Sequence, residues 1–422
     1  SMSRREFARL FAMGGSAAIL SHQTLLGSKP VRMTDPITSA GTVDWKTIRS
    51  QFLMPPELTV LNAANLCPSP APVLETVYNY TKRLDSKPVP SYRAEMREVK
   101  EKTRQQLAKY LRVTPEEILI TRNTSESNNW VSNGLDLRAG DEVVIFSDNH
   151  PSNNEAWKER GKRFGFTVNE VPPLNPHPGF DYYLEAFKKA LTPRTRVLSF
   201  THLSNTVGDL FPAKELCGMA RKRGIITLID GAQSLGLLDV DLSDIQPDFY
   251  SGSAHKWPCG PKETGVLFVN KSLQERFWPS IYSAYKGREG LAQTHEGLGQ
   301  RDTPAIHAFG QQIEFLRKIG QEKIEERSGD IATEIIEELQ KTKGVYIFTS
   351  NERALRSAVV TFRPANLEPA KVVKALEEDG IVATNLGGDD WAGVRFSPHF
   401  YNSNSDVERA VGAIRRYLRK GL

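Results

Sequence analysis

Short apolar runs alternate with longer, more polar stretches along most of the chain. Between residues 58 and 270 the runs occupy positions 58–62, 118–120, 143–146, 197–200, 225–229 and 266–268, and a helix-like stretch such as 73–84 separates them. This alternation predicts an α/β fold, with a mainly parallel sheet covered by helices on both faces. Beyond residue 305 the pattern predicts a long amphipathic helix at 306–342, a strand at 358–362, and helices from Pro369 and Asp406, typical of a smaller C-terminal α+β domain.

Composition and charge narrow the possible partners. The chain has 422 residues, of which 39% are hydrophobic and 25% charged, as in ordinary globular proteins. The formal net charge is +5, but residues 1–32 carry five basic residues and one acid, which leaves only about +1 for the rest. We therefore expect no nucleic-acid partner. Cys67, Cys217 and Cys259 have no CxxC spacing, so we expect neither a metal site nor a disulfide framework.

The amino terminus resembles a twin-arginine export signal. Ser3-Arg4-Arg5-Glu6-Phe7 precedes a short apolar stretch at 10–20, and no later segment reaches the roughly twenty apolar residues that span a bilayer. We therefore expect an export leader at residues 1–34, the twin-arginine machinery as a partner, a periplasmic location and no stable membrane insertion. The alternative is a basic tail without export function, which would leave the protein in the cytoplasm.

One acid and one lysine carry the candidate chemistry. Asp230 ends the apolar run at 225–229, and Lys256 follows the next strand-like stretch at 248–250. Open α/β sheets bind ligands beyond the carboxyl ends of their strands. An acid there would keep a pyridine nitrogen protonated, and a lysine would form a Schiff base with an aldehyde, as pyridoxal phosphate requires. Taken singly, each residue has a simpler interpretation, Asp230 as an acid that caps a helix and Lys256 as a lysine on the surface.

Further polar residues follow other predicted strands. Thr124 and Ser125 open a helix after 118–120 and offer hydroxyl and N–H groups to a phosphate, although a plain N-cap has the same appearance. His150 follows 143–146, where its ring would stack on a flat cofactor. Asn205 and Gln233 are amides placed to bond a phenolic oxygen. Each of these residues is unremarkable alone, and their common order along the chain gives them weight.

This ordered set resembles the class V aminotransferase family of fold-type I pyridoxal phosphate enzymes, over about residues 58–415. The resemblance implies pyridoxal 5'-phosphate as cofactor, a seven-stranded large domain at 58–300, a small domain at 301–422, and an N-terminal segment at 35–57 that packs with the small domain. It implies that Lys256 holds the cofactor, that Asp230 pairs with its ring nitrogen, and that His150 stacks on the ring. The residues that match phosphate ligands are Thr124, Ser125, Ser253 and His255.

The resemblance also implies partners and a substrate site. Residues 300–304 resemble a stretch whose threonine, here Thr303, reaches the phosphate of the neighbouring subunit, so we expect a homodimer with shared sites. Residues 394–397 resemble the strand whose arginine, here Arg395, grips a substrate carboxylate. Residues 381–395 contain no cysteine, and a thiol there is the nucleophile of cysteine desulfurases. The persulfide route is therefore not expected.

Several functions stay open at this stage. The general expectation is chemistry at Cα of an amino acid or N-terminal residue through an external aldimine, with Lys256 as general base and acid and His150 assisting; aminotransferase, epimerase and lyase reactions, including C–S lyase chemistry, all fit. The leader together with the missing thiol resembles the periplasmic enzyme type of pyoverdine siderophore maturation, which converts a precursor's glutamate to succinamide. Two alternatives from other classes are a catalytically silent cofactor-binding module and a metal site built from His150, His202 and His255.

Overall fold

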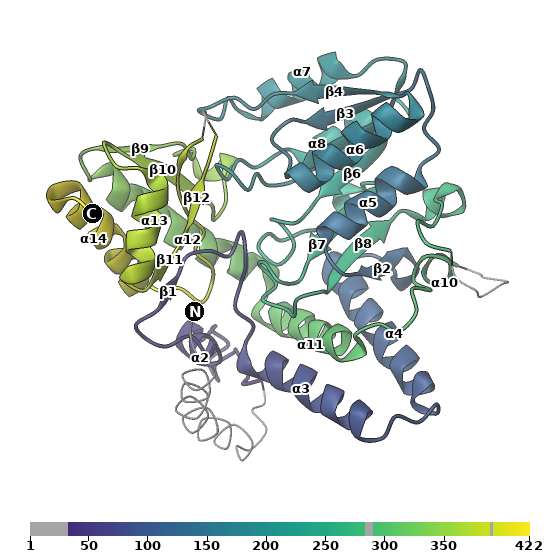
Figure 1. Cartoon of the computed structure of the whole chain (residues 1–422), viewed down its shortest axis with the longest axis horizontal. Coiled ribbons are helices and arrows are strands. Elements are labelled where there is room, and N and C mark those ends of the chain that lie inside the picture. The colour runs from purple at the N-terminus through teal and green to yellow at the C-terminus, as the bar shows by residue number, and fades with distance from the viewer. Residues whose placement is uncertain (1–32, 283–289, 389–390) are drawn as a thin grey trace, which may run out of the picture.

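The computed structural model describes residues 33–282, 290–388 and 391–422 (Figure 1). The predicted twin-arginine motif and the apolar stretch that follows it lie outside the described residues. Within them, no helix is both long enough and apolar enough to cross a bilayer. The helices are α2 Trp45–Ser50, α3 Ala71–Ser86, α4 Tyr92–Leu111, α5 Thr124–Gly134, α6 Pro151–Phe164, α7 Phe180–Ala190, α8 Ala213–Arg221, α9 Leu242–Ile245, α10 Leu291–His295, α11 Thr303–Ile319, α12 Gln321–Gln340, α13 Pro369–Glu378 and α14 Asn404–Lys420.

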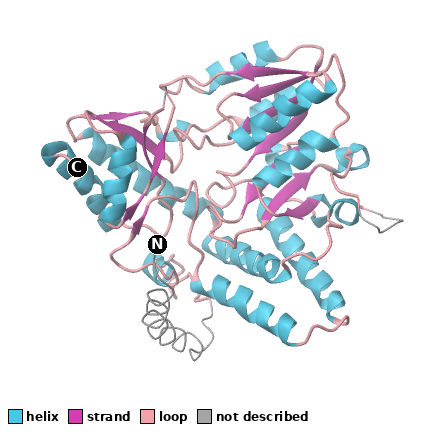
Figure 2. Ribbon diagram, in the orientation of Figure 1, coloured by secondary structure: helices cyan, strands magenta, loops and turns pink. Residues whose placement is uncertain are grey.

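A seven-stranded sheet forms the centre of the large domain, with helices on both sides of it (Figure 2). In spatial order its strands are β2 Ile118–Thr121, β8 Gly265–Val269, β7 Phe249–Ser253, β6 Ile226–Asp230, β5 Thr195–Thr201, β3 Glu142–Phe146 and β4 Thr167–Val171. Only β8 runs against its neighbours within this sheet, and the other pairs are parallel. The predicted mainly parallel α/β sheet is therefore confirmed.

Both faces of the sheet are buried, which explains the continuous apolar runs in the sequence. Successive strand residues point to opposite faces. Val143 and Ile145 pack in one core with Trp157 of α6, whereas Val144 and Phe146 pack in the other core, which includes residues of α4, α7 and α8. The edge strand β4 escaped the sequence analysis because most of its side chains are exposed or half-buried and carry no apolar run.

The smaller domain is built on a four-stranded antiparallel sheet. Its strands lie in the order β12 Thr384–Leu386, β13 Gly393–Phe396, β10 Val360–Pro364 and β9 Val345–Ile347, with α12, α13 and α14 beside them (Figure 1). A separate pair, β1 Thr59–Val60 and β11 Ile381–Val382, is parallel. The N-terminal segment lies against residues 400 and 401, and the ring centroids of Phe52 and Tyr401 are 5.1 Å apart.

The predicted single helix at 306–342 is wrong. The chain forms two helices, α11 and α12, which meet at Gly320. Gly320 has φ +99, a conformation that favours glycine and ends α11. As a result α11 packs against α3 and α4, while α12 packs against α14 and β9. The amphipathic pattern continues through the break because both helices bury one apolar face.

Candidate active site

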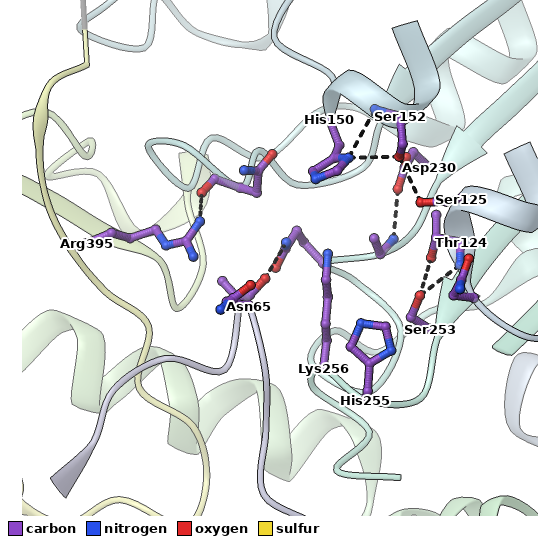
Figure 3. A pocket seen from close by; sticks show the side chains of 15 residues that line it. Asn65, Thr124, Ser125, His150, Ser152, Asp230, Ser253, His255, Lys256 and Arg395 are labelled. Atoms are coloured by element: carbon purple, nitrogen blue, oxygen red, sulfur yellow. Dashed lines mark hydrogen bonds between the residues drawn. The ribbon is translucent and has the colours of Figure 1, made fainter. Parts of the chain in front are cut away.

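The loops that follow five parallel strands converge on one cavity of about 260 Å³ (Figure 3). Its walls come from the carboxyl ends of β2, β3, β5, β6 and β7 and from β13 of the smaller domain. The residues predicted from the sequence that line it are Thr124, Ser125, His150, Asn205, Asp230, Gln233, Ser253, His255, Lys256 and Arg395. Thr303 does not line it. It begins α11 and is 4% exposed, and its contact with the phosphate of a neighbouring subunit stays a prediction.

Asp230 lines the cavity, and both oxygens of its carboxylate accept hydrogen bonds. Its Oδ1 accepts the backbone N–H of Ala232 at 3.0 Å. Its Oδ2 accepts the side-chain amide of Asn128 at 2.8 Å and that of Asn153 at 3.4 Å. The acid is 2% exposed, so these donors take the place of water.

Lys256 points into the cavity, between Arg395 of the smaller domain and Ser253 of the large domain (Figure 3). Burial of the ammonium group is the main cause that lowers the pKa of Lys256 to about 8. The charge of Asp230 opposes that shift, and the charge of Arg395 adds to it. A substantial fraction of the amine is therefore neutral near pH 8, which is the form that attacks an aldehyde.

Arg395 enters the cavity from β13, opposite Thr124 and Ser253 (Figure 3). It is 4% exposed, and its Nη1 donates to the backbone carbonyl of Asn205 at 2.7 Å. Among the described residues its Nε has no hydrogen-bond partner. Burial lowers the pKa of Arg395 to about 10, which still leaves the side chain charged at neutral pH. A buried cation with an unused donor is suited to bind an anionic group.

Hydroxyl groups gather at the start of α5, on the other side of the cavity. The backbone N–H of Thr124 donates to Ser253 Oγ at 2.8 Å, and the two side-chain oxygens are also 2.8 Å apart. Ser125 Oγ donates to Ser152 Oγ at 3.0 Å. The N-cap is Asn123, whose side chain accepts from Glu126, so Thr124 and Ser125 are free of the capping role. Hydroxyls at the positive end of a helix suit a phosphate.

The two histidines of the cavity are shifted towards the neutral form. His150 caps α6, and its Nδ1 accepts the backbone N–H of Ser152 at 3.2 Å, which places the proton of the neutral ring on Nε2. Partial burial, followed by the charges of Lys256 and Arg395, lowers the pKa of His150. Burial is also the main cause that lowers the pKa of His255 to about 4.

The two predicted amides are held by the protein itself. Gln233 Oε1 accepts the indole N–H of Trp257 at 2.7 Å, and its Nε2 donates to Ala64 O at 2.9 Å. The second N–H of this amide remains for a ligand because a primary amide has two donors. Asn205 contributes its backbone carbonyl to Arg395, while its side chain lines the cavity.

The sequence analysis missed several residues of the site. Ala64, Asn65, Asn123, Ser152 and Ala232 also line the cavity. Asn128 and Asn153 lie behind Asp230, one on α5 and one on α6. The signal in the sequence that could have identified these two residues was an asparagine in the first turns of each of two helices that begin with predicted site residues.

The alternative metal site at His150, His202 and His255 is contradicted by the structure. Among residues 33–282, 290–388 and 391–422, a group of three ligands that meet within 4.8 Å occurs only at Cys67, Cys259 and His399, all buried. Both ring nitrogens of His399 are already engaged there. Nε2 donates to Trp257 O at 2.6 Å, and Nδ1 lies 3.0 Å from Ser328 Oγ.

The donor set of the cavity fits pyridoxal 5'-phosphate. Hydroxyls at the start of α5 match the phosphate, and Asp230 matches the pyridine nitrogen. Lys256 carries an amine of lowered pKa within the same cavity. The free donor of Arg395 is left for a substrate anion. These chemistries are the ones that this cofactor requires of its protein.

Comparisons with known proteins identify the family. The family profile "Aminotransferase class-V" matches residues 60–410. Isopenicillin N epimerase of Amycolatopsis lactamdurans is 29% identical over 390 residues, covering 88% of this chain and 98% of that protein. A probable cysteine desulfurase of Xylella fastidiosa is 27% identical over 401 residues, covering 88% and 95%.

Solved structures share the fold. A C-DES variant with glycine covalently linked to its PLP cofactor superposes with a TM-score of 0.79 at 22% identity, covering 87% of this chain and 98% of that chain. The cysteine desulfurase CsdA of Escherichia coli gives a TM-score of 0.80 at 23% identity, covering 90% and 99%. The chain belongs to the class V aminotransferase family and is a fold-type I enzyme that uses pyridoxal 5'-phosphate.

Proposed function

We propose that the enzyme binds the amino group of an amino acid, or of the first residue of a peptide, and breaks a bond at its Cα. The observation that carries this proposal is the meeting of Lys256, Asp230 and Arg395 on one cavity (Figure 3). An amine of lowered pKa, a buried acid and a guanidinium with an unused donor are the groups needed to anchor the cofactor, to tune its ring and to hold a substrate carboxylate.

Pyridoxal 5'-phosphate, when bound, supplies an electron sink for the pair released at Cα. Asp230 would hold the ring nitrogen of the bound cofactor. Lys256 would remove a proton at Cα and return one, because its lowered pKa suits both directions. His150 assists this proton transfer through Nε2.

Arg395 orients the substrate by binding its carboxylate. The guanidinium already donates to Asn205 O, so its plane is fixed, and its Nε lacks a partner among the described residues. The orientation of the substrate would decide which bond at Cα breaks. Thr124, Ser125, Ser253 and His255 would hold the phosphate of the cofactor, and Asn205 and Gln233 would hold its phenolic oxygen.

The absent thiol favours chemistry without an enzyme persulfide. Residues 381–395 contain no cysteine, and Cys67 and Cys259 are both buried. Cys259 follows Lys256 in the same loop, and the backbone N–H of Cys67 donates to His255 O. Epimerase, aminotransferase and C–S lyase reactions are compatible with this arrangement. Relatives named as an epimerase and as probable desulfurases support chemistry at the Cα of an amino acid.

Export to the periplasm and a siderophore substrate form a finer proposal. Arg4 and Arg5 in the leader, together with the missing thiol, favour the remodelling of a pyoverdine precursor's glutamate to succinamide. A homodimer also belongs to this proposal. Residues 300–304 resemble a stretch whose threonine reaches the phosphate of the neighbouring subunit, and Thr303 does not line the cavity of its own subunit.

A panel of amines tests the general proposal. The cofactor-loaded enzyme is mixed with free amino acids, N-terminal glutamyl peptides and amines without a carboxylate, while the visible absorbance is recorded. We expect substrates with a carboxylate beside the amine to change the spectrum and to give products whose mass shows the bond that was cut. If borohydride-treated enzyme carries no adduct on Lys256, the proposal is refuted.

A further inference from the structure

Two buried asparagines lie directly behind the carboxylate of Asp230. Asn128 Nδ2 donates to Asp230 Oδ2 at 2.8 Å, and Asn153 Nδ2 lies 3.4 Å from the same oxygen. Both side chains are 0% exposed. They come from different helices, α5 and α6, so tertiary packing and not local sequence brings them to one atom.

The neighbours of each asparagine fix which way its amide faces. Trp157 Nε1, which can only donate, lies 3.1 Å from Asn153 Oδ1, and Ser199 Oγ donates to the same oxygen at 3.2 Å. The oxygen of Asn153 must therefore face Trp157, which turns its NH₂ group towards Asp230.

Asn128 presents its amide in the same way. Its Oδ1 accepts from Ser251 Oγ at 2.7 Å, and its Nδ2 faces the carboxylate, which can only accept. With the N–H of Ala232 on Oδ1, the hydrogen bonds recorded for the Asp230 carboxylate within the described residues all come from N–H donors. These donors hold the carboxylate in one orientation, as a hydrogen-bond acceptor.

We infer that Asn128 and Asn153 are positioning residues, which fix the orientation of the Asp230 carboxylate and keep it a hydrogen-bond acceptor for the N–H of the cofactor's pyridine ring. This inference rests on the proposed role of Asp230 as partner of that nitrogen. It adds that the acid depends on two amides that do not line the cavity and that touch neither cofactor nor substrate.

An aspartate in place of either asparagine would reverse this effect at nearly constant volume. Asn153→Asp or Asn128→Asp puts a second carboxylate against Asp230, and two adjacent carboxylates share a proton. The pair then carries one negative charge divided between two carboxyl groups, so less of it faces the ring nitrogen. Asn154→Asp is the matched control, because Asn154 is also buried on α6 but donates to the carbonyls of Phe146 and Ser147 instead of Asp230.

The test compares two ligands that differ only in the ring nitrogen. Cofactor-free enzyme is titrated with pyridoxal 5'-phosphate and with its 1-deaza analogue, in which a C–H replaces the nitrogen, and the ratio of the two dissociation constants is measured. We expect the wild-type enzyme to prefer the natural cofactor, and Asn153→Asp and Asn128→Asp to reduce this preference by about tenfold or more, the effect of one charge-assisted hydrogen bond. Asn154→Asp should retain the preference.

The outcomes separate the inference from the function on which it rests. If the wild-type enzyme binds both ligands equally, Asp230 does not serve the ring nitrogen and that part of the proposed function fails. If the wild type prefers the natural cofactor but Asn153→Asp and Asn128→Asp retain the full preference, only the role of the asparagines is overturned. A merely structural role would weaken both ligands equally and leave the ratio unchanged.

A second variant guards against failure to fold. Asn128→Leu removes the donor without adding charge, and thermal unfolding of the cofactor-free protein checks that it is folded. We expect this variant to reduce the ligand preference severalfold, less than the aspartate variants do, because Asn153 and Ala232 still donate to Asp230. An unchanged preference in a folded Asn128→Leu enzyme would contradict the inference.

Discussion

Asp230 and Arg395 lie on the same cavity but are supported by the protein to very different degrees. Asp230 receives three N–H donors from Ala232, Asn128 and Asn153. Arg395 is equally buried, yet it donates to a backbone carbonyl and keeps an Nε without a partner in the described part of the chain. A buried polar group without a partner is costly, so this difference indicates that the acid is set before any ligand binds, whereas the guanidinium is completed by one.

Removal of the amine between these two groups gives the largest expected effect. Lys256→Ala should abolish the visible absorbance of the covalently held cofactor and lower turnover by at least about 10³-fold, because one residue is both anchor and general base. Absorbance spectra and steady-state kinetics measure the two effects. Lys262→Ala, an exposed lysine in the same loop, is the control and should leave both unchanged. Normal turnover by Lys256→Ala would refute the assignment.

Replacement of the Arg395 guanidinium tests whether its Nε, unpaired among the described residues, serves a substrate carboxylate. Arg395→Lys keeps the charge but loses the planar fork, so we expect KM for an amino-acid substrate to rise about 10–100-fold with a smaller change in kcat. The same substrate as its carboxamide should show little difference between the two enzymes. Arg363→Lys is the matched control. Arg363 lies on the neighbouring strand β10, its guanidinium carbon is 5.0 Å from the centroid of the Phe348 ring, and it does not line the cavity. An equal rise in KM for both substrates would show that Arg395 does not bind the substrate carboxylate.

The pH dependence of cofactor capture tests whether the charge of Arg395 acts on Lys256. Burial and the charge of Arg395 lower the pKa of Lys256 to about 8, and the neutral amine is the reactive form. The rate at which the cofactor-free enzyme captures pyridoxal 5'-phosphate should therefore rise with pH and level off above about 8. In Arg395→Gln the positive charge is gone, so the midpoint should move to higher pH. Stopped-flow absorbance at several pH values measures the midpoint, and an identical midpoint in both enzymes would contradict this coupling.

The smallest effect is expected at Asp209, a buried acid that lacks, within the described ranges, the hydrogen-bond donors found around Asp230. It is 2% exposed, its Oδ1 has no hydrogen-bond partner among the described residues, and burial followed by the charge of Asp148 raises its pKa to about 7. The unfolded chain loses this proton near the ordinary value of 3.8, so the free energy of unfolding falls as the pH rises from about 4 to 7.

Replacement of that acid should remove this pH dependence. Asp209→Asn should raise the free energy of unfolding relative to wild type by on the order of 1 kcal/mol at pH 8 and change it little at pH 4. Denaturant unfolding at the two pH values measures the difference. Asp181→Asn, on the exposed start of α7, should show no such dependence. An equal effect of Asp209→Asn at both pH values would show that its proton is not retained on folding.

The sequence by itself determined the sheet and the residues at the ends of its strands. Apolar runs identify strands buried on both faces, and parallel strands bring their carboxyl ends to one edge. Asp230, Lys256, Thr124 and His150 each follow such a run, so their meeting in one cavity could be predicted from order alone.

Only the tertiary structure decided how these residues are supported. Asn128 and Asn153 reach Asp230 because α5 and α6 pack side by side, and no periodicity in the chain encodes that contact. The break at Gly320 was hidden for a similar reason, since α11 and α12 each bury one apolar face although they pack on different partners. Hydrophobic pattern records whether a side chain is buried, whereas the partner of a buried polar atom depends on distances between elements that are far apart in the sequence.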